Sequence, residues 1–186
     1  MRKTMMLILY CCLVMMSSCI YTAMSHLSKD DLTWIKVYDM GDTLLFHSGV
    51  MYDTLIVNEV NVYNSYNPFH VSEATDEYKA SAEILYCIIH EGETMEGFFH
   101  ISKPVHSEKL VFSICLSDRY AFDITPNLHE YESVEDIHVD DGNSRIGGNQ
   151  EDKIHIEQLT WSKTSGLREY VVKDGDSLHS YTQVKP

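Results

Sequence analysis

Histidines are the first residues in this chain that could do chemistry, because ten are present and His90 and His100 lie close together. Imidazole is a common zinc ligand, but every ligand must lie about 2 Å from the same ion. A hairpin that turns at residues 91–93 would pair His90 with Thr94. The same register pairs His100 with Ile84, roughly 20 Å along the sheet from His90. The pattern therefore predicts scattered histidines and no metal site.

Other chemical motifs are also missing. In the acidic stretch 136–143, taking Gly142 as the sixth position of a calcium loop puts Ile137 and Val139 where carboxylates are required. The chain contains no HExxH, no Gly-x-Ser-x-Gly and no glycine-rich phosphate loop. We expect no cofactor and no enzymatic activity, and a dispersed Ser/His/Asp triad stays open as the alternative.

One aromatic cluster could bind a ligand. Tyr63, Tyr66 and Phe69 are interspersed with two asparagines and a proline in an expected loop. Aromatic faces beside amide groups suit sugar stacking or contact with a peptide. The more ordinary interpretation is that these side chains cover the end of a β core.

The N-terminus has the order of a secretory signal. Arg2 and Lys3 precede an uncharged apolar run at 5–16, followed by small residues. That run is shorter than the roughly 20 residues needed to span a bilayer. The sequence MSSC at 16–19 resembles a bacterial lipobox, with Met16 in place of the usual Leu. The resemblance implies that Cys19 is lipidated and becomes the first residue. Cleavage that leaves a soluble protein is the alternative.

These features divide the chain into a signal peptide at 1–18, a lipidated tether at 19–26 and a single domain at 27–186. Ile20 follows the cysteine, which resembles neither the Asp of inner-membrane retention signals nor the acidic runs of surface-export signals. By that resemblance we expect the lipid to anchor the protein in the outer membrane, with the domain facing the periplasm.

Composition limits the partners. The 186 residues are 44% hydrophobic and 23% charged, which suits one folded domain. The formal net charge of −14 argues against nucleic acid, because phosphate binding requires clustered Lys and Arg. We expect the membrane as a partner through Cys19, together with an unidentified protein, glycan or lipid.

Strand patterns dominate after Thr43. Runs rich in β-branched residues alternate with short turn segments at 53–64, 81–90, 94–102 and 109–116. They predict an all-β fold, mainly an antiparallel sheet arranged as a sandwich or a partly open barrel. One short N-terminal helix is expected after Ser28, with acids in its first turn.

The C-terminal hairpin can be predicted in detail. A type I′ turn centred on Asp174 and Gly175 would pair Val172 with Ser177 and Tyr170 with His179. The preceding strand changes phase, because Ile154 and Ile156 alternate with one parity whereas Leu159 and Trp161 take the other. A bulge near residues 157–158 would return both sets to the core.

The expected core consists of apolar residues from these strands and the N-terminal helix: Trp34, Leu44, Phe46, Leu55, Val57, Ile84, Tyr86, Ile88, Phe112, Ile114, Ile156, Trp161 and Val171. Cys87 and Cys115 would lie on either side of a middle strand, about 9–10 Å apart. A disulfide needs Cα atoms within about 7 Å, so we expect both cysteines to be free and buried.

Both ends of the domain resemble a family of uncharacterised predicted lipoproteins of anaerobic Gram-negative bacteria. The residues that carry the resemblance are 27–35 (LSKDDLTWI), Tyr38, 41–46 (GDTLLF), 53–57 (DTLIV), Trp161, Gly166, Leu167, Tyr170, Asp174 and Gly175. The resemblance supports location and fold and implies no settled activity.

The leading expectation is a lipid-anchored cell-envelope protein that serves as a non-enzymatic binding or structural module. A periplasmic carrier of a lipid or other apolar ligand is one alternative, if the sheet curls around a cavity. An envelope hydrolase with a dispersed site is another.

Overall fold

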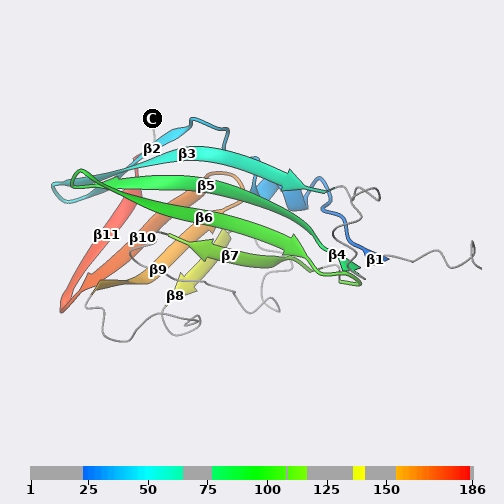
Figure 1. Ribbon diagram of the computed structural model, residues 1–186. Helices are drawn as coiled ribbons and strands as arrows, with labels where there is room; N and C mark the ends of the chain where they lie inside the picture. The colour runs from blue at the N-terminus through cyan, green and yellow to red at the C-terminus, as the bar shows by residue number, and fades with distance from the viewer. Residues whose placement is uncertain (1–22, 65–76, 108, 117–135, 141–153, 185–186) are drawn as a thin grey trace, which may run out of the picture.

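A computed structural model describes residues 23–64, 77–107, 109–116, 136–140 and 154–184. One curled antiparallel sheet of nine strands forms a half-barrel, in the order β7-β6-β5-β3-β2-β11-β10-β9-β8 (Figure 1). Its strands are β2 (Thr43–Ser48), β3 (Met51–Tyr63), β5 (Ala80–His90), β6 (Glu93–Lys103), β7 (Val111–Cys115), β8 (Asp136–Asp140), β9 (Ile154–Ser162), β10 (Gly166–Asp174) and β11 (Ser177–Gln183). The expected antiparallel β fold is confirmed, and the sheet is a partly open barrel.

Two very short strands lie outside this sheet. β1 (Ala23–Met24) and β4 (Glu77–Tyr78) pair in parallel at the N-terminal end of the half-barrel. The expected N-terminal helix is not confirmed as an α-helix, because η1 (Asp31–Trp34) is a single 3₁₀ turn. Ser28 and Asp31 exchange hydrogen bonds between side chain and backbone and fix this turn. The chain enters β2 at Thr43, which leaves no length for further helical turns.

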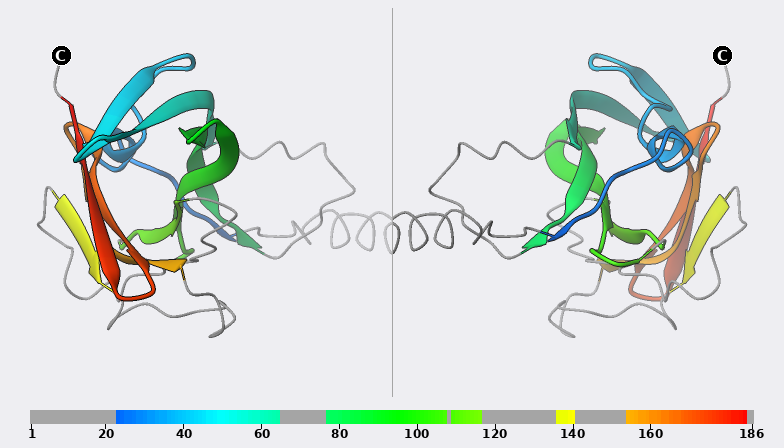
Figure 2. Two further views of the ribbon diagram at one scale, coloured as in Figure 1. Left: turned by 90° about the vertical axis from the view of Figure 1, so that its left-hand side faces the viewer. Right: turned by 90° about the vertical axis from the view of Figure 1, so that its right-hand side faces the viewer.

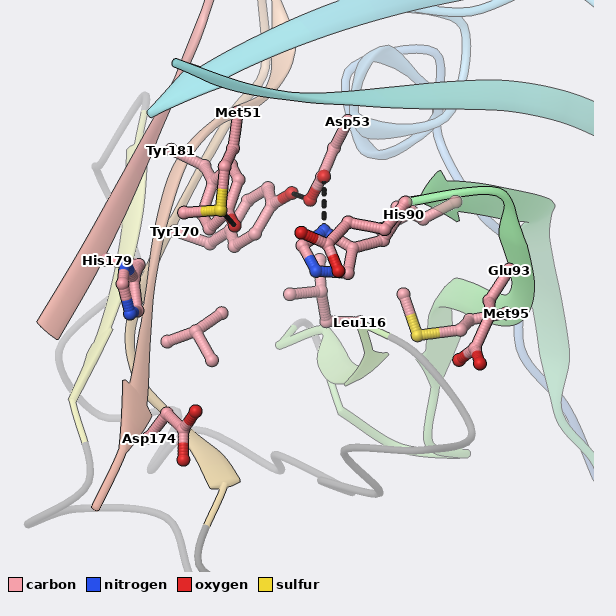
Figure 3. A pocket seen from close by; sticks show the side chains of 13 residues that line it. Met51, Asp53, His90, Glu93, Met95, Leu116, Tyr170, Asp174, His179 and Tyr181 are labelled. Atoms are coloured by element: carbon pink, nitrogen blue, oxygen red, sulfur yellow. Dashed lines mark hydrogen bonds and ion pairs between the residues drawn. The ribbon is translucent and has the colours of Figure 1, made fainter. Parts of the chain in front are cut away.

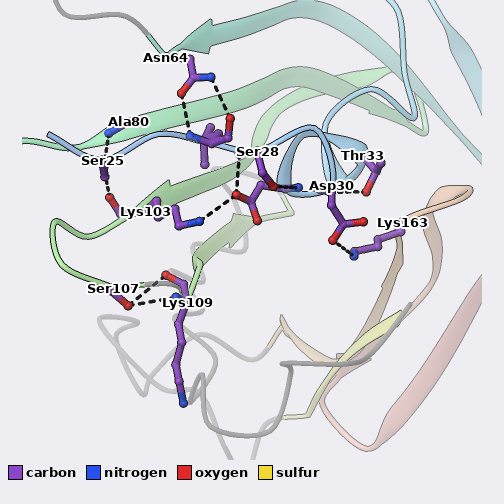
Figure 4. A network of polar contacts seen from close by, with 12 residues as sticks. Ser25, Ser28, Asp30, Thr33, Asn64, Ala80, Lys103, Ser107, Lys109 and Lys163 are labelled. Carbon is purple, nitrogen blue, oxygen red and sulfur yellow. Dashed lines mark hydrogen bonds and ion pairs between the residues drawn. The ribbon is translucent and has the colours of Figure 1, made fainter.

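The N-terminal segment runs through the open side of the half-barrel, between its two limbs (Figure 2). One limb consists of β3, β5, β6 and β7, and the other of β11, β10, β9 and β8. Asn64 holds Leu27 by hydrogen bonds to both its backbone N–H and its carbonyl, at 2.7 and 2.9 Å. Ser25 bridges the backbones of Ala80 and Lys103, and Lys103 also contacts Asp31 at 3.2 Å (Figure 4). These contacts attach the segment to the β5–β6 limb.

Aromatic side chains fill the half-barrel at this end. Trp34 packs edge-on against Phe112 of β7, and Phe99 of β6 stacks on Trp161 of β9 with ring centroids 4.0 Å apart. Tyr38 packs edge-on against Trp161 as well. The two limbs of the sheet are therefore joined through a solid aromatic core, stabilised by the large apolar area that these rings bury.

Local irregularities keep apolar side chains on the concave face. Val171 pairs with Gln158 and Val172 with Ile156, so Glu157 is an extra residue in β9, and the predicted bulge is confirmed. Similar shifts leave Arg168 of β10 and Asn58 of β3 unpaired. Each bulge reverses the side-chain alternation and returns the next apolar residue to the core.

Two hairpin registers differ from the predictions. The β10–β11 loop consists of Gly175 and Asp176, so Tyr170 pairs with Tyr181 and not with His179. Gly175 has a φ of +58°, as the first residue of a type II′ turn requires. The direct pairing also stacks the two tyrosine rings, with centroids 4.8 Å apart.

The β5–β6 turn contains two residues and not three. Glu91 and Gly92 both have positive φ, as in a type I′ turn, and His90 therefore pairs with Glu93. This register aligns Ile84 with Phe99, whereas the predicted register would have placed Ile84 opposite His100. Matching of the apolar faces therefore selects the shorter turn.

The predicted core is confirmed except at two positions, because Leu44 and Val171 are only half-buried. In β10 the buried residues are Leu167, Tyr170 and Val172, since the bulge at Arg168 turns Val171 toward the convex face. β5, β6 and β7 lie side by side as assumed, and no disulfide joins Cys87 to Cys115. Both cysteines are half-buried, not buried as expected.

Candidate ligand-binding pocket

A pocket of about 370 Å³ lies between strands at the end of the half-barrel that carries the β2–β3, β5–β6 and β10–β11 hairpin turns (Figure 3). This end lies opposite β1 and the aromatic core. The lining residues are Met51, Asp53, Ile88, His90, Glu91, Glu93, Met95, Leu116, Tyr170, Val172, Asp174, His179 and Tyr181. The volume falls in the range of roughly 300–1,000 Å³ that is typical of small-ligand sites.

Strand alternation directs these side chains inward. Asp53 follows the same parity as Leu55 and Val57 in β3, both of which are buried in the core. His90 pairs directly with Asp53 across the β3–β5 ladder, and Glu93 continues the same row on β6. Three adjacent strands therefore place a carboxylate, an imidazole and a second carboxylate side by side on the concave face.

Asp53 is the centre of a buried polar network. Its side chain is 4% exposed, and one carboxylate oxygen lies 2.6 Å from His90 Nδ1. The other oxygen accepts a hydrogen bond from the Tyr170 hydroxyl, which reaches it from β10. A carboxylate stays charged in a buried position only when it is hydrogen-bonded in this way. Because an ionised carboxylate only accepts, Nδ1 carries the proton and Nε2 is the imidazole nitrogen left to face the pocket.

Two aromatic rings form the wall beside this network. Tyr170 and Tyr181 stack face to face, and Phe46 packs against Tyr170 at 5.4 Å from behind. The His90 ring meets Tyr181 edge-on at 6.1 Å. Packing on several sides restricts the rotamers of Tyr170 and His90, so the polar groups at the base of the pocket are preorganised.

The aromatic core separates the pocket from the end of the half-barrel at which β1 lies. Burial raises the pKa of Tyr86 and also that of Tyr38, so both remain neutral phenols that donate hydrogen bonds. Tyr86 donates to the carbonyl of Cys115, and Tyr38 donates to the carbonyl of Ser165 while accepting from the Leu167 N–H. The concave face is thus filled at one end and hollow at the other.

The sequence-predicted site residues lie elsewhere. Tyr63 is at the C-terminal end of β3, far from the pocket, where it is 50% exposed and donates a hydrogen bond to Glu83. Partial desolvation, together with the nearby Glu83 carboxylate, raises the pKa of Tyr63. Tyr66, Phe69 and the proposed lipidation residue Cys19 lie outside the described residues.

The histidines are separated along the sheet. His100 pairs with Glu83, seven positions along β5 from His90. No three His, Cys, Asp or Glu side chains of the described residues converge as a metal site would require.

Sequence reasoning missed Asp53, His90 and Tyr170 as site residues. Asp53 carried a detectable signal, because it is the one charged residue at the buried parity of the run from Asp53 to Val57. Its partners could not be identified in the same way. His90 meets Asp53 through the register of β3 with β5, which the strand patterns do not specify. Tyr170 comes from a strand more than 100 positions later.

Comparison with known proteins found no matching family model, curated protein or solved structure. In the part of the chain that the structure describes, no helix is both long and apolar enough to cross a membrane.

Proposed function

We propose that this chain is a lipid-anchored cell-envelope protein that binds a small ligand in the pocket at the end of its half-barrel opposite β1. The observation that carries the proposal is the pocket itself. It combines apolar walls with a preorganised polar base at Asp53, His90 and Tyr170. A concave, largely apolar site with a few fixed polar groups is the usual form of a small-ligand site.

The position of the tether favours a ligand that comes from the aqueous side. Only three residues lie between Cys19 and Ala23, so a lipid on Cys19 would keep β1 within about 14 Å of the bilayer surface. The pocket opens at the opposite end of the half-barrel (Figure 1). This geometry favours a binding protein over a carrier that collects lipid from its own membrane.

A hydrolase is the second candidate, because His90 and Asp53 form the carboxylate–imidazole pair that general-base catalysis uses. No Ser, Thr or Cys is among the described residues that line the pocket, so water would have to be the nucleophile. For a hydrolase, His90→Gln should lower kcat/KM on p-nitrophenyl butyrate by about 100-fold or more. For a binding protein, the native protein should hydrolyse p-nitrophenyl butyrate no faster than the His90→Gln variant does.

The binding proposal is tested by blocking the pocket. His179→Trp places a large ring at the rim of the pocket, whereas Leu178→Trp adds the same ring to the convex face of the same strand. Ligand-observed NMR with a mixture of cationic, neutral and anionic fragments should show saturable binding to the native protein. Binding should persist in Leu178→Trp and disappear in His179→Trp. Equal binding to both variants, or no binding to the native protein, would contradict the proposal.

The anchor is tested separately. Cys19→Ser should abolish fatty-acid labelling and release the protein from membranes, because only a lipid on this thiol would hold the domain there. Cys12→Ser, in the predicted signal peptide, is the matched control and should leave both unchanged. Cys19→Ser protein that is still labelled and membrane-bound would refute the lipid anchor.

A further inference from the structure

The charged side chains among the described lining residues of the pocket share one sign. Asp53, Glu91, Glu93 and Asp174 line it, and no Lys or Arg is among its described lining residues. Glu93 lies on the β5–β6 wall and Asp174 on the facing β10–β11 wall (Figure 3). A concave site lined by one sign of charge focuses its field and attracts ligands of opposite charge.

The polar base independently favours a ligand that donates a hydrogen bond. Both Asp53 oxygens are already hydrogen-bonded, and this carboxylate holds the proton of His90 on Nδ1. In the neutral imidazole Nε2 is then a hydrogen-bond acceptor, and no hydrogen bond from a described residue reaches it. A ligand that reaches His90 must therefore present an N–H or O–H donor.

The remaining walls identify the body of the ligand. Met51, Ile88, Met95, Leu116 and Val172 supply apolar surface, and stacked tyrosines complete the enclosure. Tyrosine faces also attract organic cations. A hydrated metal ion would gain nothing from such walls, because hard cations take six or more oxygen ligands.

We propose that the pocket binds a protonated organic amine with a compact apolar body, its ammonium group donating to His90 Nε2 and lying in the field of the Glu93 and Asp174 carboxylates. This inference rests on the proposed binding function and adds the chemical class of the ligand. Fatty acids, phosphates and other anions are excluded by the same carboxylates, which would repel them at close range.

The test compares compounds that differ only in their head group. Phenylethyl, cyclohexylmethyl and hexyl compounds are each used as the amine, the alcohol and the corresponding carboxylate, with calorimetric titration of the full mature protein in non-ionic detergent. Protein-free micelles serve as the blank. For each skeleton that binds, the amine should bind at least about tenfold more tightly than the alcohol, because charge-assisted hydrogen bonds are worth that much. The carboxylate should bind most weakly.

One pair of variants assigns the effect to the pocket. Glu93→Gln should weaken amine binding about threefold to tenfold and leave alcohol binding unchanged. Glu96→Gln removes the same charge from the convex face of the same strand and should change neither. Added salt should reduce the preference for amines, since the mouth of the pocket is exposed to solvent.

The two proposals fail in different ways. Alcohols or carboxylates that bind as tightly as amines would overturn the assignment of the ligand class, while the binding function would stand. An amine preference that survives Glu93→Gln unchanged would also overturn it. If no amine binds saturably, the assignment is wrong, and if no fragment of any charge binds the native protein, the binding function is wrong too.

Discussion

Asp53 has two roles in the tertiary structure. It forms the base of the pocket, and it also ties the two halves of the sheet together. The ladder between β2 and β11 is short: His47 pairs with Thr182 and Phe46 with Gln183, and the Val184 N–H donates to the Leu45 carbonyl just beyond β11. The hydrogen bond from Tyr170 of β10 to Asp53 of β3 spans this short seam from the inside. A buried charge held by two donors is costly to disturb, because removing either donor leaves the carboxylate underpaired.

At the same scale, Asp31 links the N-terminal segment to β6. Burial alone would raise the pKa of Asp31, but hydrogen bonds from Ser28 and Lys103, with the Lys103 charge, lower it overall. A carboxyl group whose folded pKa lies below its unfolded pKa of about 3.9 stabilises the fold above about pH 4. This contribution is lost as the pH falls through the folded pKa.

Asp31→Asn should therefore lower the free energy of unfolding by about 1–2 kcal/mol at pH 7, and by less at pH 3. Urea denaturation at the two pH values measures this difference. Asp30→Asn is the control, because its side chain is 81% exposed and its ion pair with Lys163 should contribute under about 1 kcal/mol. A loss for Asp31→Asn that is equally large at pH 3 would show that charge has no part in it.

At the scale of elements, bulges and turns decide which residues face the pocket. The bulge at Arg168 turns Tyr170 inward, and the two-residue turn at Glu91 brings Glu93 opposite His90. The β9–β10 turn is equally constrained, because it accommodates Tyr38 of the N-terminal segment. Gly166 has a φ of +67°, and a Cβ atom there would come within 2.5 Å of the Tyr38 ring.

Gly166→Ala should destabilise the domain by about 2–4 kcal/mol, because it combines unfavourable backbone geometry with overpacking against a buried ring. Gly49→Ala is the matched control. Gly49 has a similar φ of +59° but open space around it, so about 1 kcal/mol is expected. Thermal unfolding of both variants gives the comparison, and equal losses would mean that the Tyr38 contact is unimportant.

At the scale of the whole molecule, the half-barrel is closed at one end by its own N-terminal segment and hollow at the other. The 13 residues of β3 run the length of the sheet, which is about 40 Å. A lipid at Cys19 would place the filled end at the membrane and the pocket at the far end.

This orientation predicts unequal distances from the bilayer. Fluorophores attached at Lys79→Cys, beside β4, should transfer energy efficiently to acceptors on lipid headgroups in proteoliposomes. The same fluorophore at Asp176→Cys, in the β10–β11 turn, should transfer far less. The unsubstituted chain gives the background from Cys87 and Cys115. Equal transfer from both positions would mean that the domain lies flat on the membrane, with the pocket near the lipid.

The sequence by itself determined the antiparallel β class, the bulge at Glu157 and most of the core. Each of these follows from short-range alternation of apolar and polar residues, which a strand imposes with a period of two. Ile156 and Trp161 lie at opposite parities of one strand, so both can face the core only if a bulge lies between them. The proposed lipid anchor also rests on local sequence alone.

Only the tertiary structure decided the site. Asp53, His90 and Tyr170 come from three strands, and their meeting depends on the register between β3 and β5, the bulge at Arg168 and the curl of the sheet. A register shift of one residue in any of these strands would turn its polar side chain to the other face of the sheet. The native registers are selected by the packing of all nine strands together. Burial of apolar side chains on the concave face outweighs the small differences in free energy among turn types. Local sequence patterns therefore predict the strands well but do not predict which polar residues share a pocket.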